Sequence, residues 1–274
     1  MTERTIVITG ASDGIGAAAA RRLSRAGENV IVVGRSESKT AAVATELGAD
    51  RFVADFADLS QVRTLAQKLL SRYPHIDVLA NNAGGMTSRV QMTADGCEHT
   101  YQVNYLAPFL LTTLLLDVLV DSRASVINTS SSSQKLLGKI TIEDIENTHR
   151  YRPSKAYALS KLAVILFTKE LHRRYHGAGL SVAAFHPGYV NSNFGPASGS
   201  RWLALQRNTL TMRLVATADR GADQLVWLAL SRPGIDWKSG EYYSRHKIAK
   251  PNRAAYDSGL ARELWDRSLA LIAT

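Results

Sequence analysis

Residues 9–16 read Thr-Gly-Ala-Ser-Asp-Gly-Ile-Gly, and this glycine-rich stretch decides the fold. It follows an apolar, strand-like run (Thr5–Thr9) and opens an alanine-rich helical stretch (Ile15–Ala26). Glycines let the backbone turn sharply and approach a phosphate closely, and the start of the next helix presents free N–H groups and a positive dipole end. In this context the stretch predicts a dinucleotide pyrophosphate site, with a purely structural turn as the alternative. The residues predicted to contact the cofactor here are Gly10, Ser12, Asp13, Gly14, Ile15 and Gly16.

Short β-branched runs alternate with longer helical stretches along the rest of the chain. Further strands are predicted at Asn29–Val33, Arg51–Val53, Asp77–Ala80, Ser125–Thr129 and Leu180–Phe185. Further helices are predicted at Ser38–Leu47, Leu59–Ser71, Asp95–Leu119 and Pro153–Tyr175. Continuous apolar strands fit a parallel sheet that is covered on both faces. The pattern therefore predicts an α/β fold: a doubly wound, mostly parallel Rossmann-type sheet of about seven strands with helices on both faces.

The chain is expected to fold as one domain over residues 1–274, because no linker-like composition divides it. Residues 193–212 interrupt the alternation, since they open with Gly, Pro and Ser and continue as a helical stretch that contains Trp202. We interpret them as a substrate loop or lid, with an ordinary surface connection as the alternative.

Composition limits the other classes of function. The single cysteine, Cys97, excludes an intrachain disulfide, and the N-terminus shows no export signal, so a cytoplasmic location is expected. The most apolar segment, Leu106–Val120, is interrupted by Pro108 and is too short for a membrane span. The formal net charge is +9, but the basic residues are scattered, so no nucleic-acid partner is predicted. No metal site is predicted either.

The end of the second strand indicates which nicotinamide cofactor is used. NAD-dependent sites usually place an acidic side chain here to hold the ribose 2′-hydroxyl, whereas this chain has Gly34 followed by Arg35. A guanidinium can form charge-assisted hydrogen bonds to a 2′-phosphate. Arg35 therefore predicts NADP(H) in preference to NAD(H), with an ordinary surface arginine as the alternative.

The segment Tyr151–Lys161 reads YRPSKAYALSK and contains two Tyr–Lys pairs, each with a spacing of four residues. An ammonium group beside a tyrosine stabilises the phenolate and lowers the pKa of the phenol. Pro153 fits the first turn of a helix and pushes Arg152 away from helical geometry, so the helix is predicted to begin at Pro153. Tyr157 and Lys161 then share one helical face and are predicted to be the catalytic pair. Tyr151, outside the helix, is the alternative acid.

Together these motifs resemble the short-chain dehydrogenase/reductase family, in its single-domain branch. The glycine stretch has that family's spacing, TGxxxGxG, and Asn81–Gly84 reads NNAG as the family does. The segments Ala156–Leu171 (AYALSKLAVILFTKEL) and Val103–Thr112 (VNYLAPFLLT) resemble the retinol-dehydrogenase-like branch. The resemblance is continuous over residues 5–192. Many NADP-using relatives carry a second basic residue in the glycine loop, where this chain has Asp13, and Ser12, Ser36 and Lys39 are candidates to assist.

The resemblance implies the rest of the site. Further cofactor contacts are implied at Asp55, Phe56, Asn82, Ala83, Gly84, Tyr157, Lys161, Pro187, Gly188, Val190 and Ser192. The family register places the catalytic hydroxyl on Ser131, although a slip of one residue would choose Ser130 or Ser132. Asn104 is implied to bend its helix and to hold a water in a proton relay with Lys161. His186 is expected to be structural.

The activity implied is NADP(H)-dependent interconversion of a carbonyl and an alcohol, with Tyr157 as acid and base. The substrate is a small molecule, and the apolar surroundings of Trp202 favour a hydrophobic one. Reduction of a C=C bond on the same fold and a catalytically idle NADP(H)-binding sensor are the alternatives; the complete Tyr–Lys set argues against the sensor. Homodimers and homotetramers are both compatible with the sequence.

Overall fold

The computed structural model describes residues 3–188 and 217–273. Within them the strands are β1 (Thr5–Thr9), β2 (Asn29–Gly34), β3 (Arg51–Val53), β4 (Val78–Asn81), β5 (Ser125–Thr129), β6 (Ser181–Phe185), β7 (Glu241–Ser244) and β8 (Lys247–Ile248). The longer helices are α1 (Gly14–Arg25), α2 (Glu37–Leu47), α3 (Leu59–Arg72), α5 (Ala107–Leu114), α8 (Pro153–Tyr175), α10 (Ala218–Leu230) and α11 (Ser258–Ile272). Short helical pieces are α4 (His99–Tyr101), α6 (Leu116–Asp121), α7 (Ile142–Glu146), the π-helical segment η1 (Gln102–Leu106) and the 3-10 turns η2 (Ser132–Leu136), η3 (Thr148–Arg150), η4 (His176–Ala178) and η5 (Arg253–Tyr256).

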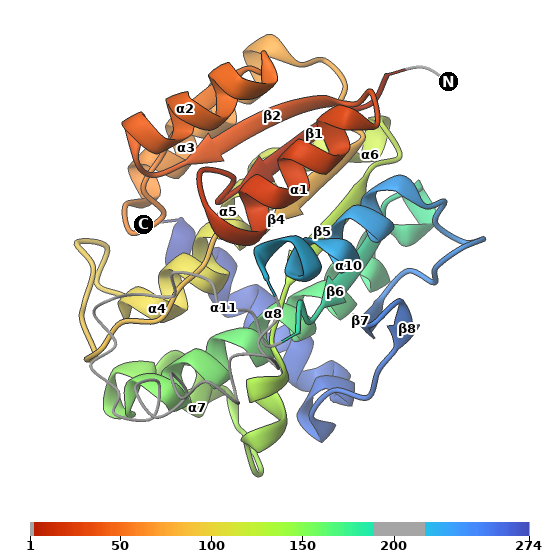
Figure 1. The fold of residues 1–274 in the computed structure, drawn as a ribbon. Coiled ribbons are helices and arrows are strands. Elements are labelled where there is room, and N and C mark those ends of the chain that lie inside the picture. The colour runs from red at the N-terminus through yellow and green to blue at the C-terminus, as the bar shows by residue number, and fades with distance from the viewer. Residues whose placement is uncertain (1–2, 189–216, 274) are drawn as a thin grey trace, which may run out of the picture.

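The strands form one twisted sheet in the order β3-β2-β1-β4-β5-β6-β7-β8 (Figure 1). Pairing is parallel from β3 to β7, which confirms the predicted doubly wound, mostly parallel fold. The described part of the chain has eight strands, which agrees with the prediction of about seven. The additional strand β8 has only two residues and pairs antiparallel with β7 across a tight turn at Arg245 and His246. A strand of two residues is too short to show an alternating hydrophobic pattern in the sequence.

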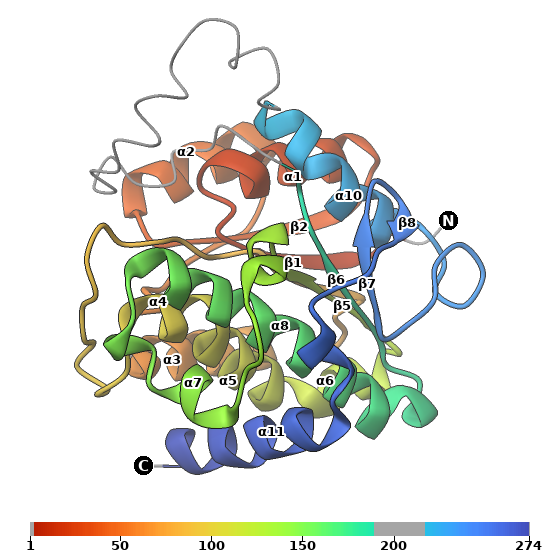
Figure 2. The same cartoon turned by 90° about the horizontal axis from the view of Figure 1, so that it is seen from below.

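Helices cover both faces of the sheet, as Figure 2 shows edge-on. Successive side chains of a strand point to opposite faces, and Ile6 and Ile8 accordingly pack beneath α1, α2 and α10. Val7, between them, packs on the other side, where α3, α5 and α8 lie and α11 covers α8. All three side chains are fully buried. The continuous apolar strands of the sequence therefore serve two hydrophobic cores.

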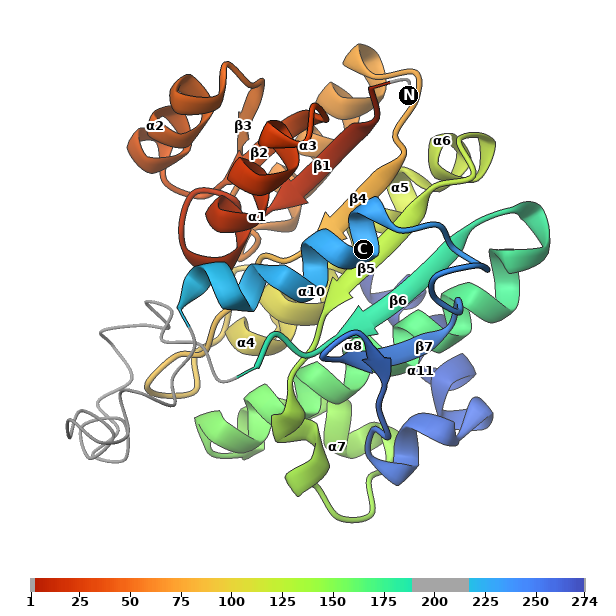
Figure 3. The same cartoon turned by 45° about the vertical axis from the view of Figure 1, so that its right-hand side comes forward.

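The order of the strands reverses between β1 and β4, because the chain first builds outward from β1 to β3 and then resumes on the other side of β1. The carboxyl ends of β1, β4, β5 and β6 point toward the same edge (Figure 3). In open α/β sheets this edge, at the point of reversal, is where ligands bind. A ligand site is therefore expected at the loops that follow these strands.

The stretch Asp95–Leu119 is not one helix, contrary to the prediction. Helical structure begins at α4, passes through the π-helical segment η1 (Gln102–Leu106), and continues as α5 and then α6. Pro108 lacks the N–H that an α-helix would donate to the carbonyl of Asn104, so the regular ladder is interrupted there. A π-helical turn widens the helix, and such turns are frequent at functional sites.

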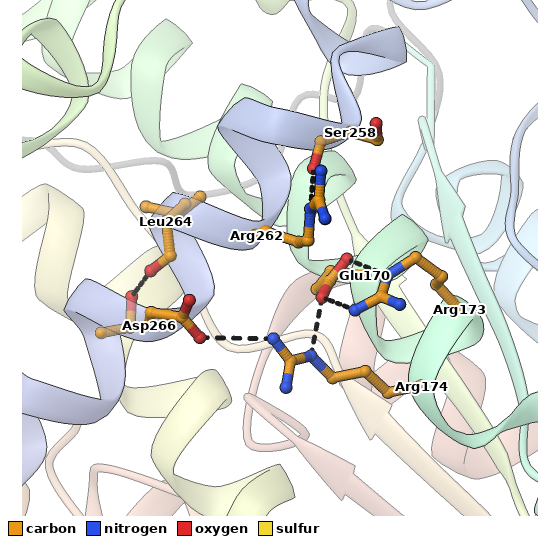
Figure 4. Close-up of polar contacts among 8 residues, drawn as sticks. Glu170, Arg173, Arg174, Ser258, Arg262, Leu264 and Asp266 are labelled. Atoms are coloured by element: carbon orange, nitrogen blue, oxygen red, sulfur yellow. Dashed lines mark hydrogen bonds and ion pairs between the residues drawn. The ribbon is translucent and has the colours of Figure 1, made fainter.

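Helix α11 is held against α8 by an ion pair and by contacts of aromatic side chains. The Glu170 side chain is only 1% exposed and accepts hydrogen bonds from Arg173 at 2.6 Å and Arg174 at 2.7 Å. Arg174 also reaches Asp266 on α11 at 3.3 Å (Figure 4). The Trp265 ring lies below the Arg174 guanidinium at 4.7 Å from the ring centroid. This cluster makes α11 a rigid cover for the helix that carries Tyr157.

Candidate active site

The glycine turn between β1 and α1 lies directly against the Asn82–Gly84 turn after β4. A Cβ on Gly10 would be 2.8 Å from the Ala83 Cα, so no larger residue fits there. The Thr9 hydroxyl accepts hydrogen bonds of 3.0 Å from the backbone N–H groups of both Asn82 and Ala83. These contacts hold the two turns together at the carboxyl edge of the sheet. The start of α1 thereby presents backbone N–H groups at that edge, which is the donor set that a pyrophosphate requires.

The end of β2 has no room for the acid of an NAD-dependent site. A Cβ on Gly34 would lie 2.3 Å from the Thr40 hydroxyl and 2.7 Å from the Ser12 Cβ. Arg35 follows as an exposed residue. Lys39 forms an ion pair of 2.7 Å with Asp13, so a basic side chain does reach the glycine turn. At the end of β2 the chain therefore carries an exposed basic side chain, Arg35, next to a glycine that leaves no space for an acidic one.

The adenine side of the turn is partly closed by the residues after β3. The Asp55 carboxylate accepts a hydrogen bond of 3.0 Å from the Ala57 N–H and is half-buried. The Phe56 side chain is 5% exposed and packs in the core, so only its backbone can face a cofactor. Pro187 and Gly188 follow β6 at the same edge. Val190, Ser192 and the predicted lid 193–212 lie outside the described residues.

Helix α8 begins at Pro153, as predicted, and the preceding Arg152 has extended geometry (φ −68°, ψ 151°). Tyr151 therefore lies outside the helix. Its hydroxyl donates to Asp144, and the Lys155 ammonium lies 3.7 Å from the centroid of its ring. The first Tyr–Lys pair of the repeated motif is thus a packing contact on the surface.

The second pair faces the end of β5. The Lys161 Nζ lies 5.7 Å from the centroid of the Tyr157 ring and donates a hydrogen bond of 2.9 Å to the Thr129 carbonyl. The Tyr157 hydroxyl shares a hydrogen bond with the Ser131 side chain. The neighbouring Ser130 is turned away, because its hydroxyl donates to the backbone carbonyl of Lys161 at 2.7 Å.

Asn104, in the π-helical segment, is joined to the same cluster. Its amide accepts from the Gly85 N–H at 2.7 Å and donates to the Gly85 carbonyl at 2.9 Å and to the Ser160 hydroxyl at 3.0 Å. A Cβ on Gly84 would lie 2.7 Å from the Asn104 carbonyl oxygen and 3.3 Å from the Lys161 Nζ. Glycine at this position therefore lets the turn approach both side chains.

Burial shifts the pKa values of Tyr157 and Lys161, the predicted catalytic pair. Loss of solvent lowers the pKa of Lys161, which is 2% exposed, to about 7. Loss of solvent also raises the pKa of Tyr157 to about 12, although part of this side chain remains exposed and the Ser131 hydrogen bond acts in the opposite direction. Burial is therefore the larger influence on the Tyr157 pKa, and the lowering expected from Lys161 is not seen in this structure.

The match to known proteins agrees with this arrangement. A model of the family described as short chain dehydrogenase matches residues 4–201. The chain belongs to the short-chain dehydrogenase family. Members bind a nicotinamide cofactor and oxidise alcohols or reduce carbonyls, so the protein is an NAD(P)-dependent oxidoreductase of this kind.

Relatives within the short-chain dehydrogenase family span almost the whole chain. One is the "Putative daunorubicin C-13 ketoreductase DnrU" of Streptomyces sp. (strain C5), 38% identical over 98% of this chain and 92% of its own. Retinol dehydrogenase 13 of Homo sapiens is 36% identical over 98% of this chain and 84% of its own. A short chain dehydrogenase of Escherichia coli CFT073, solved with NADPH, superposes with a TM-score of 0.66 at 28% identity, covering 84% of this chain and 91% of its own.

Several contacts of this short-chain dehydrogenase site could not be read from the sequence. Ser160 next to Asn104 and the Thr129 carbonyl next to Lys161 meet only through the fold. His186 accepts a hydrogen bond of 3.3 Å on Nδ1 from the Ser132 N–H. Burial, with Lys135 and Arg245 nearby, lowers the pKa of His186 to about 4, so the imidazole is neutral at neutral pH.

No helix within the described residues is both long and apolar enough to cross a lipid bilayer.

Proposed function

We propose that this protein is an NADP(H)-dependent oxidoreductase that interconverts a carbonyl and an alcohol on a hydrophobic small molecule, with Tyr157 as the acid and base. The observation that carries the proposal is the convergence of Ser131, Tyr157, Lys161 and Asn104 at the carboxyl edge of the sheet. Four side chains from three separate segments meet there, beside a turn built for a pyrophosphate.

Each side chain has a distinct role in the proposed reaction. The bound nicotinamide supplies or accepts the hydride at the carbonyl carbon. Tyr157 donates its phenolic proton to the developing alkoxide during reduction, and a pKa of about 12 keeps that proton in place at neutral pH. Ser131, which shares a hydrogen bond with Tyr157, orients the substrate oxygen. Lys161, in its charged form, stabilises the phenolate, and Asn104 supports the relay that returns the proton.

Preference for NADP(H) is supported by the end of β2 and by a structural relative. Gly34 has no room for an acidic side chain, Arg35 is exposed directly after it, and Lys39 lies over the glycine turn. The E. coli relative was solved with NADPH. Two relatives are named for daunorubicin and for retinol, both large hydrophobic molecules, which supports a substrate of that class.

Turnover of NADPH with a panel of ketones, aldehydes, quinones and conjugated enones tests the proposal. We expect oxidation of NADPH with ketones or aldehydes, and Tyr157→Phe should still bind NADPH but lose turnover by about 10²- to 10⁴-fold. Tyr151→Phe is the matched control and should keep wild-type activity. Full activity of Tyr157→Phe would contradict the assignment. Turnover of enones alone would favour C=C reduction, and NADPH binding without any turnover would favour the sensor.

A further inference from the structure

A buried asparagine near the C-terminus holds the loop that carries Ser131. Asn252 is 8% exposed and lies in the connection between β8 and α11. Its Nδ2 donates to the backbone carbonyls of Gln134 at 3.1 Å and Leu137 at 2.7 Å. Its backbone N–H donates to the side-chain oxygen of Gln134 at 2.6 Å. The Asn252 side-chain oxygen accepts from the Ala254 N–H at 2.9 Å, so both ends of its amide are fixed.

The hydrogen bonds to Asn252 act at the outer end of this loop, where the chain leaves the end of β5. Ser131 begins a single 3-10 turn, η2 (Ser132–Leu136), after which the chain leaves the sheet. Ser130 and Ser132 fix the inner end through hydrogen bonds to the Lys161 carbonyl and to His186. At the outer end, Leu136 is 87% exposed. The next residue, Leu137, packs partly buried against the hydrophobic core, so packing and the hydrogen bonds to Asn252 hold the outer end together.

Asn252 is itself attached to rigid parts of the fold. The Ala249 N–H donates to the Tyr242 carbonyl at 2.7 Å, which ties the connection to β7. On the other side Asp257 caps α11, which the Glu170 cluster fixes to α8. These contacts fix the position of the loop with Ser131 relative to the helix that carries Tyr157 and Lys161, although about 120 residues separate Asn252 from that loop.

Gln134, the partner of Asn252 in the loop, is itself fully buried. Its side-chain oxygen is occupied by the Asn252 N–H, and its amide nitrogen has no hydrogen-bond partner among the described residues. The hydrogen-bonded connection from Asn252 therefore ends at Gln134, in the turn that Ser131 begins.

We infer that Asn252 is a positioning residue for the reaction: it sets the place of the Ser131 hydroxyl by binding the backbone of the loop after it. The inference rests on the proposed function of Ser131. A displacement of about 1 Å in a reacting geometry can lower the rate about 100-fold. A residue with a merely structural role would change the amount of folded protein but not the turnover of each folded molecule.

Asn252→Asp is the sharpest variant. The carboxylate keeps the acceptor for the Ala254 N–H. The Nδ2 that donates both hydrogen bonds to the loop is replaced by an oxygen, which faces the Gln134 and Leu137 carbonyls and cannot donate to them. We expect kcat per NADPH-binding site to fall about 10- to 100-fold, with the Kd for NADPH unchanged. Asn147→Asp is the matched control: its Nδ2 bonds the Glu143 carbonyl at 2.9 Å at the surface, and its kcat should not change. If Asn252→Asp does not fold, Asn252→Ser keeps the helix-capping acceptor and serves in its place.

A double-mutant cycle with Ser131→Ala decides whether Asn252 acts through the serine. Rates are measured in single turnovers with enzyme in excess of NADPH and carbonyl, so that slow variants remain measurable. We expect Asn252→Asp to have no further effect once Ser131 is replaced, because coupled residues are not additive. Multiplicative effects, or an unchanged kcat per site in Asn252→Asp, would overturn the inference. Absence of turnover by the wild-type protein would instead overturn the proposed function, so the two failures are distinguishable.

Discussion

Lys161 donates a hydrogen bond of 2.9 Å from its Nζ to the carbonyl oxygen of Thr129, the last residue of β5. Within residues 3–188 and 217–273 this is the one hydrogen bond that the ammonium forms, and burial lowers its pKa from 10.5 to about 7. Between these two values the unfolded chain binds a proton that the folded protein does not. The stability of the protein is therefore reduced by this side chain below pH 7, and the reduction disappears as the pH rises toward 10.5.

Lys161→Met should consequently yield a more stable but inactive protein. One unit of pKa difference corresponds to about 1.36 kcal/mol, so the expected gain in the free energy of unfolding is a few kcal/mol at or below pH 7. Thermal melts at several pH values check this, and the gain in Tm should shrink as the pH rises from 7 toward 10.5. Lys155→Met, at an exposed position on the same helix, should show no such trend. A gain independent of pH would mean that packing of methionine, not removal of charge, is responsible.

Ser131 and Ser130 should respond differently to the same substitution. Ser131→Ala removes the hydroxyl that bonds Tyr157, and we expect kcat to fall about 10²-fold or more with little change in Tm. Ser130→Ala removes a buried hydrogen bond to the Lys161 carbonyl, which keeps its helical donor within α8, and we expect a loss of about 0.5–1.5 kcal/mol in unfolding free energy with most of kcat retained. Steady-state kinetics and urea unfolding measure the two effects. The opposite result would shift the catalytic register by one residue.

Much of this site could be predicted because its signals are local. Pro153 constrains its own φ and the geometry of Arg152, and that alone separates Tyr157 from Tyr151. The turn after β1 likewise carries its own requirement for glycine, as the contact between Gly10 and Ala83 shows. Strands in the interior of the sheet are recognisable because both of their faces are buried.

Contacts between distant segments could not be predicted in this way. The bonds between Asn252 and Gln134 join residues 118 positions apart, and neither residue has a local pattern that requires the other. The π-helical segment at Asn104 depends on Pro108 and on the turn at Gly85 together, so it was hidden within an apparently regular apolar helix. The net effect of burial on the pKa values of Tyr157 and Lys161 also depends on the complete fold.

Glu170→Gln should loosen the C-terminal helix. Burial, the largest influence, raises the pKa of Glu170, but the hydrogen bonds from Arg173 and Arg174 together outweigh it, so the pKa lies below its usual value. The stabilisation is present above the unfolded pKa, near 4.5, and is lost as the pH falls through the lower folded value. We expect a loss of about 1.5–3 kcal/mol at pH 7, because the charge-assisted hydrogen bonds from Arg173 and Arg174 are lost while these partly exposed arginines stay in contact with solvent.

Urea unfolding at pH 7 and at lower pH measures the effect of Glu170→Gln, and the difference from wild type should narrow in acid. The matched control is Glu263→Gln, which removes an exposed pair with Arg267 and should cost less than about 1 kcal/mol. Equal losses of unfolding free energy in the two variants would show that burial of Glu170 adds nothing to the strength of its ion pairs.

Arg35 should set the preference for NADP(H), since Gly34 cannot be exchanged for an acid. Arg35→Ala removes charge-assisted hydrogen bonds worth about 1.5–3 kcal/mol, which corresponds to an increase of about 10- to 100-fold in the Kd for NADPH. The Kd for NADH should not change. Arg51→Ala, at the amino end of β3 and paired with Glu37 at 3.3 Å, is the control and should affect neither cofactor. Fluorescence titrations with both cofactors measure these constants.

Gly34→Asp tests the same cofactor preference by adding an acidic side chain at the end of β2. Many NAD-dependent relatives in the dinucleotide-binding folds carry an acid at this position, yet a Cβ here would lie 2.3 Å from the Thr40 hydroxyl. That hydroxyl donates to the Ser36 carbonyl at 2.6 Å in the first turn of α2, so it cannot move without disturbing the helix start. We therefore expect Gly34→Asp to lower Tm and to weaken both cofactors, rather than to convert the enzyme to NADH. A clean switch to NADH with an unchanged Tm would show that α2 yields to the new side chain and that steric exclusion does not set the preference.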